Sequence, residues 1–174
     1  MDLQISLVNH HPREEAARDQ LLRLHERYDL TRWQFTNRVA INHLEIPHSH
    51  PVLTLNAHWL RDDLAALSTY LHEQMHWFSL SSTGDFAIAG RELRERYPEV
   101  PDFEAGGARN ERSTYLHFVI CALEYQALAD IVGETEAIAT INVMTHYRWI
   151  YDTVLGQWPY FSDLLARTGI VVPG

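Results

Sequence analysis

The chain has 174 residues with a net charge of −9, and 46% of its residues are hydrophobic. This length and balance are typical of a globular protein, so we expect a single domain over residues 1–174. The negative charge repels phosphate groups, which disfavours nucleic acid and anionic lipid as partners. We find no apolar run of the roughly 18 to 20 residues that a membrane span needs. A single cysteine, Cys121, excludes an internal disulfide, and the N-terminus lacks the pattern of a secretory signal. We therefore expect a cytoplasmic location.

The N-terminal third predicts one helix and a small sheet. Residues 13–28 have acidic residues early and leucines at helical spacing, which indicates a helix. Alternating apolar residues predict a strand over 33–41. Prolines exclude a central strand around 47–51, so 51–56 fits an edge strand, and such an edge could pair with an extended peptide. We expect a small mixed sheet of about three strands between residues 3 and 56.

The rest of the chain predicts helices. A long helix is predicted from Trp59 onward, and Gly84 ends it. Its apolar face has residues at spacings of three and four: Leu60, Leu64, Leu67, Leu71, Met75 and Phe78. Further helices are expected over 87–97, over 111–132 with Gly133 as its stop, once or twice within 134–155, and over 160–168. The predicted fold class is α+β, with helix dominant.

The sequence HEQMH lies inside the helix predicted after Trp59. Residues four apart share one face of a helix, so His72 and His76 would project side by side and could chelate one ion. Glu73 lies next to them, where a carboxylate can take a proton from a metal-bound water. The chain has eleven histidines, so a chance match is the alternative. The position of both histidines directly after core residues, Leu71 and Met75, favours a metal site.

A catalytic zinc usually has three protein ligands, so one more is needed. His117, Cys121 and Glu124 form one stripe of the predicted helix 111–132, at spacings of four and three. Glu124 is the first candidate, because a carboxylate among apolar neighbours is costly to bury unless it is paired or bound to a metal. His117 and then Cys121 are the alternatives. Without a metal, a salt bridge from Glu124 to Arg148 would explain the glutamate.

His72, Glu73 and His76 resemble the signature of the zincin metallopeptidases. With a glutamate from a later helix, the chain resembles the gluzincin clan, especially its small minigluzincin-like members. The resemblance implies a short sheet followed by a mainly helical, zincin-like core, with the motif on a central helix. It implies that His72, His76 and Glu124 hold Zn²⁺ and that Glu73 is the general base.

The predicted function is therefore that of a zinc-dependent peptidase, which hydrolyses peptide bonds in a peptide or protein substrate. The oxyanion of amide hydrolysis needs a donor beyond the metal. Tyr147 and His146 are the candidates, and the alternative is that they only pack in the core. Two other functions stay open: a non-catalytic metal-binding module for regulation or interaction, and a metal hydrolase of a non-peptide amide. The presence of Glu73 favours catalysis, because a structural metal site has no use for a general base.

Overall fold

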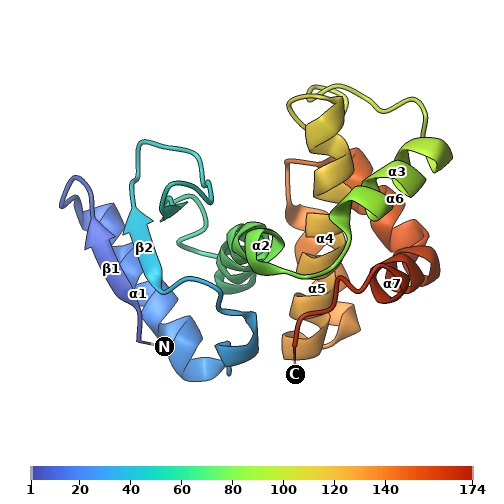
Figure 1. Cartoon of the computed structure of the whole chain (residues 1–174). Coiled ribbons are helices and arrows are strands. Elements are labelled where there is room, and N and C mark those ends of the chain that lie inside the picture. The colour runs from blue at the N-terminus through green and yellow to red at the C-terminus, as the bar shows by residue number, and fades with distance from the viewer. Residues whose placement is uncertain (1, 174) are drawn as a thin grey trace.

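The computed structural model describes residues 2–173. The predicted α+β class is confirmed: three short strands lie in the N-terminal third and helices make up most of the rest. Helix α2 (Asp63–Ser81) lies between the part that holds the sheet and the all-helical C-terminal part (Figure 1). The other elements are β1 (Gln4–Leu7), α1 (Pro12–Arg27), the 3₁₀ turn η1 (Thr31–Trp33), β2 (Arg38–Ile41), β3 (Leu53–Leu55), α3 (Phe86–Arg96), α4 (Glu111–Val132), α5 (Glu134–Val143), α6 (Arg148–Gly156) and α7 (Trp158–Arg167).

The sheet has the strand order β1-β2-β3, and both of its ladders are parallel. The expectation of a mixed sheet is therefore wrong, because the three strands are all parallel; among the described residues, one isolated antiparallel bridge, between His48 and Thr54, lies outside these ladders. The strand predicted over 33–41 is shorter and covers Arg38–Ile41 only. The reason lies in Gln74 of α2, whose amide accepts from the backbone N–H groups of Phe35 and Thr36 and donates to the Thr36 carbonyl. These bonds tie the segment before β2 to the helix and not to the sheet.

Strand β3 lies at the sheet edge, as predicted, and its three residues are buried. The outward-facing N–H of Thr54 donates to the His48 carbonyl at 2.7 Å, and the His48 N–H donates back at 3.1 Å. The loop before β3 therefore occupies these edge groups. Pairing of a substrate peptide with Thr54 would require this loop to move.

Helix α2 is buried on more than one side, because it packs between the two parts of the chain. It begins later than the pattern from Trp59 predicts, since the Asp62 side chain accepts from the Ala65 N–H at 3.0 Å and caps it there. The predicted core residues Leu67, Leu71, Met75 and Phe78 are buried. His72, Glu73 and Gln74 are buried as well. Most of the motif is thus part of the interior, and His76 is half-buried.

Helix α4 has the predicted bounds. The Asn110 side chain accepts from the Ser113 N–H at 2.9 Å at its start, and Gly133 ends it with a φ of 88°. By length and mean composition, α4 is long and apolar enough to cross a membrane, although charged residues interrupt its apolar run. However, 67% of its apolar window is buried inside the fold, which identifies it here as a core helix.

Buried Glu14 joins the start of α1 to the ends of β1 and β2. Its carboxylate accepts from the backbone and side chain of Asn9 and from the backbone N–H and Nδ1 of His43, over 2.9 to 3.1 Å. Burial raises the pKa of Glu14, but these hydrogen bonds from His43 and Asn9 outweigh it and hold the pKa well below its ordinary value. The ionised carboxylate therefore stabilises the fold.

We predict that Glu14→Gln lowers the melting temperature at pH 7. Glu14 has a lower pKa in the folded state than in the unfolded chain, where it is near 4.5. Its carboxylate therefore stabilises the fold above this pH, and the stabilisation is lost as the pH falls further. The difference from wild type should therefore shrink as the pH falls below about 4.5. Thermal unfolding followed by circular dichroism measures both effects.

The exposed neighbour Glu15 provides the control. Glu15→Gln should leave the melting temperature nearly unchanged. Equal losses in the two variants, or a Glu14→Gln deficit that does not depend on pH, would contradict the stabilising role of the Glu14 carboxylate.

Candidate metal centre

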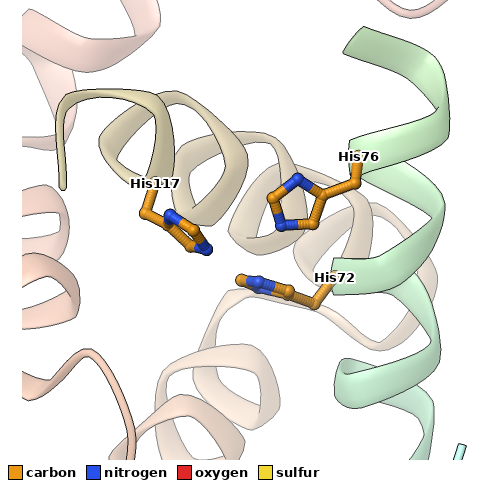
Figure 2. Close-up of side chains that lie close together, drawn as sticks. All are labelled: His72, His76 and His117. Atoms are coloured by element: carbon orange, nitrogen blue, oxygen red, sulfur yellow. The ribbon is translucent and has the colours of Figure 1, made fainter. Parts of the chain in front are cut away.

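Three histidine rings converge between α2 and α4 (Figure 2). His72 and His76 come from α2, and His117 comes from α4; one ring nitrogen of each lies within 4.8 Å of the others. The ring centroids are 5.0 to 5.5 Å apart. Three nitrogens this close together could hold one ion, for which the usual zinc–nitrogen distance is about 2.0–2.1 Å. The motif histidines thus lie side by side, as the i, i+4 spacing predicts.

A second group that could hold an ion consists of His72, Cys121 and Glu124, again within 4.8 Å of one another. It shares His72 with the first group and does not include His76. Among the described residues, no such group contains His72, His76 and Glu124 together. The stripe predicted on α4 is buried along its whole length, but its members face different parts of the site.

Glu124 is fully buried, and three donors satisfy its carboxylate. Ser68 donates to Oε1 at 2.5 Å, while the Tyr151 hydroxyl and His72 Nδ1 donate to Oε2 at 2.6 and 2.8 Å. The alternative of a salt bridge to Arg148 does not occur, since Arg148 bonds to the Ile141 carbonyl and to Asp152. Because Glu124 engages Nδ1 of His72, Nε2 is the ring nitrogen that could face an ion. A carboxylate on the far nitrogen is the usual partner of a metal-binding histidine.

Burial keeps two of the three rings neutral. Desolvation, reinforced by the neighbouring histidines, lowers the pKa of His76 to about 2 and that of His117 to about 4. His117 Nδ1 donates to the Ser113 carbonyl at 2.7 Å, which leaves Nε2 with its lone pair. For His72, burial lowers the pKa, but hydrogen bonds with Cys121 and Glu124 outweigh it and raise the pKa well above its usual value. Neutral imidazole is the form that binds metals, so His72 would have to release a proton to an incoming ion, whereas His76 and His117 would not.

Glu73 lies on the pocket side of α2 and is 6% exposed. Desolvation raises the pKa of Glu73 to about 7, against a smaller lowering effect of His72. Within residues 2–173 we find no hydrogen bond or ion pair to its carboxylate. A buried carboxylate without a fixed partner has its lone pairs free for a proton from solvent or substrate.

A pocket of about 300 Å³ opens beside His72 and Glu73. It lies between the two parts of the chain, and its lining residues come from the loops around β3, from α2, α4 and α6, and from the loops before α4 and α6. They are Ile46, Pro47, Asn56, His58, Trp59, Thr69, His72, Glu73, Phe103, Glu124, Met144, Thr145, His146, Tyr147 and Tyr151. Both predicted oxyanion donors, Tyr147 and His146, therefore reach the pocket.

The two donors differ in position. The Tyr147 ring lies 4.3 Å from the His117 ring and 5.5 Å from the His72 ring, centroid to centroid. Its backbone is in the left-handed region, with a φ of 56°, which is uncommon outside glycine and is found where surrounding contacts impose it. His146 is exposed and stacks on Phe103 at the pocket mouth. Tyr147 is thus the better placed of the two.

Sequence reasoning missed the two hydroxyl groups that hold Glu124. Ser68 precedes His72 by four residues, and Tyr151 follows Tyr147 by four. Residues four apart share one helix face, so Ser68 lies on the same face as His72, and Tyr151 lies on the same face as Tyr147. The search for donors to a buried glutamate would have found them.

No family model, curated protein or solved structure matches this chain. The resemblance to zincins therefore stays a prediction that rests on the motif and the order of the elements. Any function must be argued from the site itself.

We predict that Tyr151→Phe destabilises the protein. It removes one of three donors to a fully buried carboxylate, and a buried group left without its hydrogen bond costs about 1–3 kcal/mol. Chemical denaturation measures the loss in free energy of unfolding. Tyr125→Phe is the control, because the Tyr125 side chain is also buried but has no hydrogen bond within the described chain. Equal losses would show that the bond to Glu124 is not what stabilises this region.

Proposed function

We propose that His72, His76 and His117 hold a divalent metal ion, and that Glu124 orients the His72 ring through its hydrogen bond to Nδ1. The convergence of the three imidazoles supports this proposal, because it is the group of described residues that contains both motif histidines. Three imidazoles suit zinc first, although iron, manganese and nickel accept similar donors. The proposal replaces Glu124 by His117 as the third ligand.

The same site supports the hydrolysis of an amide bond, and we propose a peptidase activity. A metal ion held there supplies Lewis acidity, which polarises a carbonyl group and acidifies water. Glu73 is the residue that takes the proton from the attacking water and passes it to the leaving amine. Its position on the pocket wall, its freedom from other partners and its raised pKa suit this task. Tyr147, which lines the pocket beside the rings of His72 and His117, would donate to the oxyanion.

The number of ligands separates this proposal from a non-catalytic metal-binding module. A structural zinc is held by four protein ligands, whereas a catalytic zinc has three and an open position. Of the three histidines, His72 lines the pocket, and beside it lies Glu73, a carboxylate without a hydrogen-bond partner among the described residues. This arrangement favours catalysis over a purely structural role.

We predict that the protein binds about one zinc per chain and that His117→Ala weakens binding at least 100-fold, because it removes one of three ligands. Glu124→Gln should weaken binding about 10- to 100-fold, which is typical for loss of a carboxylate behind a ligating histidine. Competition with a chromophoric chelator measures the affinities, and circular dichroism checks that each variant is folded.

Cys121→Ser is the matched variant on the same stripe of α4 and should keep most of the zinc. If Cys121→Ser and Glu124→Gln lose zinc while His117→Ala keeps it, the ion sits in the group of His72, Cys121 and Glu124. Retention of zinc by the His72→Ala, His76→Ala double variant would contradict both arrangements.

We predict that Glu73→Gln keeps its zinc and loses activity. The amide has nearly the size of the carboxylate but cannot accept a proton, and general-base assistance is worth about 10²- to 10⁴-fold in rate. The measurement is kcat/KM of the zinc-loaded protein on a peptide that the wild type cleaves, found in a peptide library.

Glu95→Gln, at an exposed position on α3, is the control and should leave kcat/KM unchanged. A fully active Glu73→Gln variant would contradict the role of the base. A zinc-loaded wild type that cleaves no peptide in the library would favour the non-catalytic module or a non-peptide amide as substrate.

A further inference from the structure

The pocket beside Glu73 has a largely apolar wall. Trp59, Met144, Tyr147 and Tyr151 line it, and Met144 and Tyr151 are buried. Its volume of about 300 Å³ lies at the lower end of the range for small-molecule sites, about 300–1,000 Å³. The space therefore suits one or two side chains and not a large cofactor.

The charges around the pocket disfavour an anionic ligand. No arginine lines it, and the chain contains no lysine. Of its three histidines, His72 is already paired with Glu124, and His58 and His146 are exposed, so no buried and unengaged basic group is available to pair with a carboxylate or phosphate. The acidic residues in its wall are Glu73 and Glu124. Glu124 is already satisfied by three donors, and Glu73 is the proposed base. A charged ligand group would therefore be desolvated without a dedicated partner, which is costly.

Two of the side chains that line the pocket are large, apolar and exposed, and they mark its mouth. Ile46 is 75% exposed in the loop before β3, and Phe103 is 55% exposed in the loop before α4. Large apolar side chains that flank a pocket are typical of a surface that an apolar ligand covers. The two residues come from segments far apart in sequence, so the pocket brings them to one opening.

We propose that this pocket binds a neutral, apolar side chain, aromatic or branched aliphatic, next to the amide that is cleaved, with Ile46 and Phe103 as specificity-determining residues. The assignment of this group to a cleaved substrate rests on the proposed peptidase function. Binding of the side chain itself rests on the pocket alone and needs no metal.

The test uses metal-free protein and four small amides that differ in one side chain. These are N-acetyl-L-phenylalaninamide and its alanine, aspartate and lysine counterparts, titrated at millimolar concentration and followed by NMR. We expect the phenylalanine compound to bind at least about tenfold more tightly than the alanine compound, because it buries a ring. The aspartate and lysine compounds should bind no more tightly than alanine.

Substitutions at the mouth locate the binding site. Ile46→Asp and Phe103→Asp place a charge beside the ligand, and each should weaken the binding of the phenylalanine compound about three- to tenfold. Leu44→Asp is the matched control, because Leu44 is 74% exposed in the same loop and does not line the pocket. This control should leave the affinity unchanged.

Several results would overturn the proposal. They are tighter binding of the aspartate or lysine compound, equal affinity for all four, no binding of any, or a Leu44→Asp effect as large as those at the mouth. Failure of the zinc or peptidase tests leaves the amide result in place, since it is measured without metal. If a peptide is cleaved, kcat/KM should also fall about tenfold or more when its apolar residue next to the cleaved bond is changed to alanine.

Discussion

The buried carboxylate of Glu124 is the constraint on which the site depends. A carboxyl group in the interior is costly unless its oxygens are hydrogen-bonded. Its donors come from two other helices: Ser68 and His72 from α2 and Tyr151 from α6. The three helices must therefore pack at one mutual position to satisfy one side chain. The same bond that satisfies Glu124 also sets the direction of the His72 ring.

Much of the fold could be predicted because its signals are local. The bounds of α4 follow from a capping residue and a terminal glycine, and the core face of α2 follows from apolar periodicity. The strand over 33–41 was predicted too long, since alternation cannot show that Gln74, some forty residues later, binds this backbone. Non-local hydrogen bonds decide such cases, and the sequence does not display them.

The candidate site was predictable in composition but not in arrangement. The motif fixes the spacing of His72 and His76, and the stripe on α4 correctly identifies three residues that reach the same region. Which of them faces His72 and His76 depends on the position along α4 at which this helix crosses α2. The crossing position is set by packing, so sequence reasoning could only rank His117, Cys121 and Glu124 by their chemistry.

Gln74, which lies within the HEQMH motif, fixes the orientation of α2 about its own axis. Each residue of an α-helix advances about 100° around the axis, so position 74 points roughly opposite to positions 72 and 76. Its three hydrogen bonds to residues 35 and 36 hold the far side of α2. The helix cannot turn about its own axis without breaking them, and any such turn would swing both imidazoles out of alignment with His117. The rotational phase of the helix is thus locked by a segment that contributes no group to the site.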